Sequence, residues 1–167
     1  MLKGITIRKA IEFAIATEET GVKAYSQLAE KFAEQEEMSA AFSLLAEDER
    51  THKAQFQTLL GQIPSGEGAV VTNDDDSGYL RAMAMSEFFG GDQGLIGELE
   101  AAQSLQGALL RVLGFEKATF SYYRAVKDVL GGSEVLDSII QEEKGHIMRL
   151  MKYILTDEKF KGLADVF

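Results

Sequence analysis

Four segments of this 167-residue chain place apolar side chains at the spacing of one helix face, and a glutamate interrupts each of these apolar stripes. The stripes cover about residues 6–32, 39–60, 100–130 and 133–155. Burying a lone carboxylate costs several kcal/mol unless the group is paired, protonated or bound to a metal. Four such interruptions therefore indicate a helical bundle with carboxylates in its core. Metal coordination would explain all four of them at once.

Two of the stripes also carry a histidine three residues after the glutamate, at Glu49 and His52 and again at Glu143 and His146. Residues three apart share a helix face, so each Glu-x-x-His motif directs a carboxylate and an imidazole to one point. These are the only two histidines of the chain, one in each half. The repeated motif predicts two metal ions held between helices; the alternative is a surface Glu–His pair or a core imidazole.

The other two stripes contribute one glutamate each, Glu18 and Glu116, and each is followed seven residues later by a tyrosine, Tyr25 or Tyr123. Each Glu–Tyr pair precedes a Glu-x-x-His segment, so the two halves of the chain repeat. A phenol on the glutamate's face could hydrogen-bond a metal ligand or simply fill the core. Both roles remain open at the level of sequence.

Several acidic residues adjoin the stripe glutamates but fall out of phase with the apolar positions. The helical period directs them away from the core, so we expect them to face solvent. They are Glu19, Glu47, Asp48 and Glu142.

The connections predict an antiparallel helix pair in each half, over residues 5–60 and 100–156. Both turns are short, at 33–38 and at 131–132, and Ser133 is suited to cap the last helix. The whole chain, 1–167, is expected to form one domain.

The middle segment, 61–99, is rich in Gly and Asp and long enough to cross a bundle about 35 Å in length. We expect it to join parallel second and third helices and to include a short helix over 79–89. The acidic run 74–76 could bind calcium but lacks a full EF-hand pattern, so a solvated turn is the favoured interpretation. Residues 157–167 are expected to be a C-terminal tail.

Composition excludes several classes of function. The formal net charge of −10 disfavours nucleic acid and anionic membranes as partners. The absence of cysteine excludes disulfides, iron–sulfur clusters and thiol catalysis from this sequence. No signal peptide or membrane span is visible, so a cytoplasmic location is the default expectation.

One glutamate from each of two helices and a Glu-x-x-His from each of the other two form the di-iron or di-manganese carboxylate pattern of ferritin-like bundles. With this set and its paired tyrosines, the chain resembles the ferritin-like domain of the rubrerythrin family. The resemblance extends over the whole bundle. Bacterioferritins share much of the pattern and remain a rival.

This resemblance implies an all-α, ferritin-like four-helix bundle with a long crossover between the second and third helices. It implies two iron ions, although manganese or zinc would also suit carboxylate and imidazole ligands. Glu49 and Glu143 would bridge the ions, and the remaining ligands would each bind one of them. The expected metal ligands are Glu18, Glu49, His52, Glu116, Glu143 and His146, with Tyr25 and Tyr123 beside them.

The sequence departs from rubrerythrins at two points. Full-length rubrerythrins carry a cysteine-ligated rubredoxin-type iron centre, and this sequence has no cysteine. They also carry an additional glutamate one turn after the ligand on the third helix, which takes part in a redox-linked iron shift. Thr119 occupies that position here. A rubrerythrin-type peroxidase cycle is therefore less firmly implied than the metal site.

The leading functional hypothesis is an oxidoreductase that reduces hydrogen peroxide or dioxygen with electrons from an external donor protein. Iron handling, with Fe(II) oxidised at the same site for storage, is the second hypothesis. A bundle that metals merely stabilise is the third. A rubrerythrin-like protein is expected to be a homodimer or small homo-oligomer, whereas a storage protein would form a cage.

Overall fold

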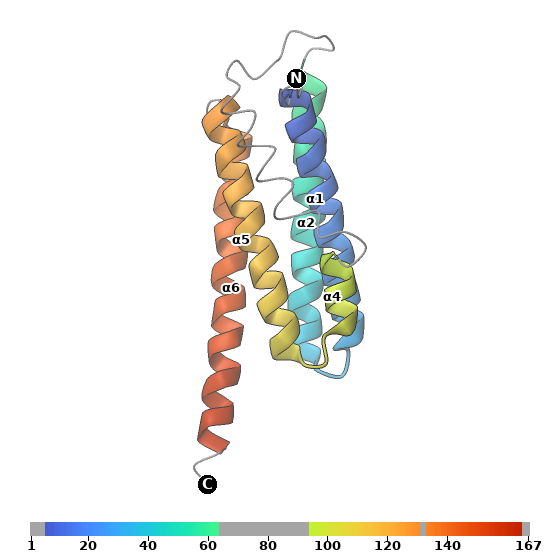
Figure 1. Cartoon of the computed structure of the whole chain (residues 1–167), viewed down its shortest axis with the longest axis vertical. Helices are drawn as coiled ribbons and strands as arrows, with labels where there is room; N and C mark the ends of the chain where they lie inside the picture. Colours follow the sequence, from blue (N-terminus) through green and yellow to red (C-terminus); the bar gives the residue numbers. More distant parts are fainter. Residues whose placement is uncertain (1–5, 64–93, 131–132, 165–167) are drawn as a thin grey trace.

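The described residues, 6–63, 94–130 and 133–164 of a computed structural model, form five helices and no strand (Figure 1). This confirms the all-α fold class. The helices are α1 (Ile7–Lys31), α2 (Glu36–Gln62), α4 (Leu95–Ala101), α5 (Leu105–Leu130) and α6 (Glu134–Ala164).

Local sequence explains where two of the long helices begin. The hydroxyl of Thr6 accepts a hydrogen bond from the Lys9 amide at 3.2 Å, which caps α1. Ser133 accepts one from the Leu136 amide, also at 3.2 Å, and caps α6. The predicted Ser133 cap is therefore confirmed.

The four long helices form two antiparallel pairs, α1 with α2 and α5 with α6 (Figure 1). α2 and α5 run in the same direction, because α2 ends at the top of the view in Figure 1 whereas α5 begins at the bottom. The end of α2 and the start of α5 therefore lie at opposite ends of the bundle, which confirms the predicted long crossover between the second and third helices.

Two predicted boundaries are wrong. The third long helix begins at Leu105 rather than near residue 100, because Ala102 adopts an extended conformation that ends the short helix α4 at Ala101. The last helix continues to Ala164, so most of the expected tail at 157–167 is helical. The expected helix at 79–89 and the acidic run at 74–76 lie outside the described residues.

The core consists of two hydrophobic clusters separated by a polar layer. One cluster includes Tyr25, Phe42 and Leu109, and the other includes Ile11 and Phe56. On each long helix the buried glutamate lies between side chains of the two clusters. The bundle is therefore apolar toward both ends and polar across its middle.

Within the described ranges, no helix combines the length and the hydropathy that a membrane span requires.

Candidate metal centre

The polar layer consists of the six residues that the stripes predicted. Each has at most 1 % of its surface exposed, and together they come from all four long helices. They are Glu18 on α1, Glu49 and His52 on α2, Glu116 on α5, and Glu143 and His146 on α6.

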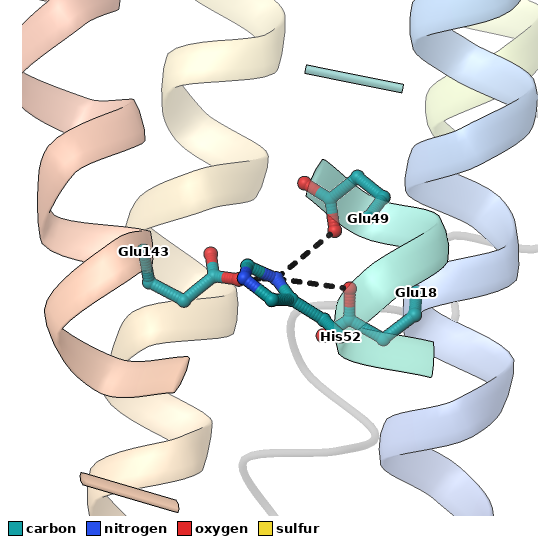
Figure 2. A group of neighbouring side chains, drawn as sticks. All are labelled: Glu18, Glu49, His52 and Glu143. Carbon is teal, nitrogen blue, oxygen red and sulfur yellow. Dashed lines mark ion pairs between the residues drawn. The ribbon is translucent and has the colours of Figure 1, made fainter. Parts of the chain in front are cut away.

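One half of the layer surrounds the imidazole of His52 (Figure 2). Its Nδ1 lies 2.9 Å from Glu143 Oε1, 3.6 Å from Glu18 Oε2 and 3.9 Å from Glu49 Oε2. These four residues offer ligand atoms that all lie within 4.8 Å of one another. Three helices thus converge on one point.

The other half surrounds His146 in the same manner. Its Nδ1 lies 3.4 Å from Glu49 Oε1, 3.5 Å from Glu116 Oε2 and 4.0 Å from Glu143 Oε2. These residues form a second group with ligand atoms within 4.8 Å of one another. Glu49 and Glu143 belong to both groups, so the two groups share a pair of carboxylates.

The donor set fits two cations. Buried polar atoms in proteins nearly always have hydrogen-bond partners, yet seven oxygen and nitrogen atoms of this layer have none. Both imidazole Nδ1 atoms are among them, together with at least one oxygen of every glutamate in the layer. Carboxylate and imidazole donors of this kind suit iron, manganese or zinc.

The electrostatics of the metal-free layer point the same way. Burial, followed by the negative charge of Glu49, raises the pKa of Glu18 well above its usual value. Burial and the charges of Glu116 and Glu49 do the same to the pKa of Glu143. Metal-free, the layer therefore retains protons that cations would displace.

Burial by itself would lower the pKa of His146, but its close contacts with the Glu116 and Glu49 carboxylates outweigh burial and raise the pKa to about 10. The pKa of His52 is raised as well, because contacts with Glu143 and Glu18 outweigh its burial. Both imidazoles are therefore cationic at neutral pH when no metal is bound.

The two tyrosines cross between the halves. The Tyr25 hydroxyl on α1 donates a hydrogen bond to Glu116 on α5, and the Tyr123 hydroxyl on α5 donates one to Glu18 on α1. Both phenols are fully buried, and burial together with the neighbouring carboxylates raises their pKa values well above 10.0. The sequence left open whether each phenol fills the core or hydrogen-bonds a carboxylate. In the structure each phenol is buried and also donates a hydrogen bond to a carboxylate of the layer.

Two residues expected to face solvent are indeed partly exposed, but each also contacts a histidine of the layer. Glu142 is 43 % exposed, yet its Oε2 lies 2.9 Å from His52 Nε2. The Oδ2 of Asp48 lies 3.3 Å from His146 Nε2. A carboxylate at Nε2 favours the tautomer with a proton there, which leaves the Nδ1 lone pair free for a metal.

The helical period of one helix could not predict these two contacts, because each joins two helices. Glu142 on α6 contacts His52 on α2, and Asp48 on α2 contacts His146 on α6. The available signal was their position directly before Glu49 and Glu143. Glu19, by contrast, is 48 % exposed and pairs with Lys23 and Lys53, as its phase predicted.

Fold and site together define the chain as a ferritin-like helical bundle with a buried Glu/His layer that could hold metal ions. A sequence model of the Rubrerythrin family matches residues 9–154, and the chain belongs to this family. No curated protein matches it significantly.

The chain is also similar to a solved structure from Thermotoga maritima, provisionally described as a ferritin-like diiron-carboxylate protein. The TM-score is 0.65 at 23 % sequence identity, over 92 % of this chain and 97 % of the other. At that identity the likeness supports the fold alone.

Proposed function

We propose that the Glu/His layer binds two iron ions and reduces hydrogen peroxide or dioxygen with electrons from an external donor. The observation that carries this proposal is the convergence, from four helices on two adjacent points, of seven buried ligand atoms that have no hydrogen-bond partner. A purely structural polar layer would be expected to satisfy its own hydrogen bonds.

Each proposed ligand has a role that follows from its place in the two groups. Glu49 and Glu143 occur in both groups and are proposed to bridge the ions. One ion would take Glu18 and His52 as its remaining ligands. The other would take Glu116 and His146. Four carboxylates balance the charge of two divalent cations, which offsets the cost of burying them.

Two Fe(II) ions held side by side would supply the two electrons that convert one H2O2 and two protons into two water molecules. The protein's part is to orient the ligands and limit access of water to the layer. Tyr25 and Tyr123 hold the two non-bridging carboxylates in place and keep their own protons at neutral pH, because the pKa of each is strongly raised.

The electrons for repeated turnover would come from outside this sequence, since it has no cysteine with which to build a rubredoxin-type centre. We propose a separate electron-donor protein, and a homodimer or small homo-oligomer as the working assembly. Size-exclusion chromatography with light scattering would distinguish such an assembly from a storage cage.

One observation favours iron handling as a second candidate function. Thr119, at the position of the additional rubrerythrin glutamate, is 1 % exposed, and its hydroxyl donates to the Phe115 carbonyl at 2.9 Å. It offers no carboxylate toward which an iron ion could shift. Oxidation of Fe(II) for storage would need no such shift.

The test is stopped-flow absorbance of anaerobic, Fe(II)-loaded protein mixed with hydrogen peroxide. We expect rapid oxidation at about one peroxide per two Fe(II), followed by turnover only when an electron donor is added. Glu18→Gln should slow the oxidation strongly, whereas the matched control Glu19→Gln, one residue away and exposed, should not.

Two results would replace the proposal. Protein that is inert to peroxide but mineralises added Fe(II) in air would be an iron-handling protein. Protein that does neither but melts at a lower temperature without metal would use its ions only for stability.

A further inference from the structure

We propose that the two metal positions are inequivalent: the position with His52 binds its ion more tightly and fills first, and Arg149 weakens the position with His146. This inference rests on the proposed function only in taking the Glu/His layer as a metal site. It requires no particular reaction at the metals.

The two halves of the layer are otherwise closely matched, which makes the difference between them informative. Each position has one histidine, one non-bridging glutamate and the same two shared carboxylates. The glutamate that belongs to one group only accepts a tyrosine hydrogen bond in both cases: Glu18 from Tyr123, and Glu116 from Tyr25. The residue types of the two ligand sets therefore provide no reason for unequal affinity.

The carboxylates behind the two histidines differ in distance and in surroundings. Glu142 lies 2.9 Å from His52 Nε2, and its other oxygen accepts a hydrogen bond from the neutral Ser138 hydroxyl at 3.1 Å. Asp48 lies 3.3 Å from His146 Nε2, and the same Oδ2 atom lies 3.4 Å from Arg149 Nη1. The Glu142 oxygen at His52 is thus separate from the one that Ser138 contacts, whereas a single Asp48 oxygen faces both His146 and the Arg149 cation.

The two Glu-x-x-His segments differ in charge at the position three residues after the histidine. Arg149 follows His146 by three residues, and the residue three after His52 is Gln55. One half thus has a permanent positive charge where the other has a neutral amide. Within the described part of the chain, Asp48 pairs with an arginine and Glu142 does not.

The effect on affinity follows from the chemistry of the imidazole. A carboxylate at Nε2 makes Nδ1 a stronger donor, and its loss typically lowers metal affinity about 10- to 100-fold. A guanidinium on the same carboxylate withdraws part of that charge and also repels an incoming cation. We therefore expect the His146 position to bind about 10-fold more weakly.

The experiment is a titration of metal-free protein with Co(II), followed by calorimetry and by visible absorbance. The full chain should show two binding steps separated by about 10-fold in affinity. His146→Ala should retain the tighter step and His52→Ala the weaker one. The reverse assignment, or two steps of equal affinity in the full chain, would overturn the inference.

Arg149→Gln, which copies the residue of the other half, should tighten the weaker step about 10-fold and leave the tighter step unchanged. The control is Arg50→Gln, which removes the same charge from an exposed Arg50–Glu47 pair on α2 and should change neither step. If both variants shift the steps equally, net charge rather than the Asp48 contact is responsible and the inference fails.

These outcomes are distinguishable from failure of the proposed function. Two unequal Co(II) steps in a protein that ignores peroxide would retain the inference and reject the proposed activity. Equal steps in a protein that reacts with peroxide would do the opposite. Absence of any Co(II) binding would reject both.

Discussion

Gly21→Ala should disturb the centre of the polar layer, because a methyl group added to α1 at Gly21 would press on a shared carboxylate. A Cβ atom added at Gly21 would lie 3.0 Å from Glu49 Cδ, 3.1 Å from Cγ and 3.2 Å from Oε2. Glu49 is 1 % exposed and has little room to move. Because its carboxylate belongs to both ligand groups, any displacement would affect both metal positions.

The expected magnitude combines two opposing terms. Replacing Gly by Ala within a helix contributes about 0.5–1 kcal/mol of stability. Overpacking a filled core costs about 1–3 kcal/mol. The metal-free variant should therefore be less stable by roughly 0–2.5 kcal/mol, which for a chain of this size lowers Tm by about 2–4 °C per kcal/mol. A shifted Glu49 should weaken both Co(II) steps by at least about 10-fold, or about 1.4 kcal/mol each.

The assay is thermal melting of the metal-free variant, followed by Co(II) titration. Gly114→Ala on α5 is the matched control, because a Cβ there meets nothing within 4 Å. It should raise stability by up to about 1 kcal/mol and leave both binding steps unchanged. If Gly21→Ala behaves like Gly114→Ala in both measurements, the argument that Gly21 makes room for Glu49 is refuted.

Two further predictions concern the layer's protons. Tyr25→Phe removes the hydrogen bond to Glu116 and should weaken Co(II) binding mainly at the His146 position. In the same titration the affinity of the His52 position should change by no more than about twofold. Equal loss of affinity at both positions would contradict the pairing of Tyr25 with Glu116. The pKa of His146 in the metal-free layer is raised from 6.5 to about 10, so its stabilising charge is fully present below pH 6.5 and is lost as the pH rises to 10. Denaturant unfolding of the metal-free protein should show its free energy of unfolding falling from pH 6.5 to 10. Over the same range Co(II) affinity should rise, because fewer protons must be displaced. A free energy of unfolding that increases over this range would contradict the prediction.

The helical periodicity predicted most of the fold, because the free energy of a bundle comes mainly from burying one stripe of each helix. Where the periodicity was weak, the boundaries were wrong. The third stripe predicted one helix from about residue 100 to 130, but the chain is extended at Ala102 and α5 begins only at Leu105. The available signal was Ser104, whose hydroxyl accepts a hydrogen bond from the Gly107 amide at 3.1 Å.

The sequence by itself determined which side chains must meet, since a glutamate or histidine in phase with an apolar stripe has nowhere to lie except the core. That rule located the six residues of the layer. That Glu49 and Glu143 are shared between two groups did not follow from the stripes; the resemblance to rubrerythrins implied it, and the two groups in the structure contain both residues.

Only the tertiary structure decided which carboxylates contact the Nε2 atoms of the two histidines. Asp48 and Glu142 are out of phase on their own helices, and each touches the histidine of another helix. Arg149 shares one of these carboxylates and not the other. Such contacts depend on the separation and rotation of neighbouring helices, which the packing of the whole bundle sets and which the period of a single helix does not encode.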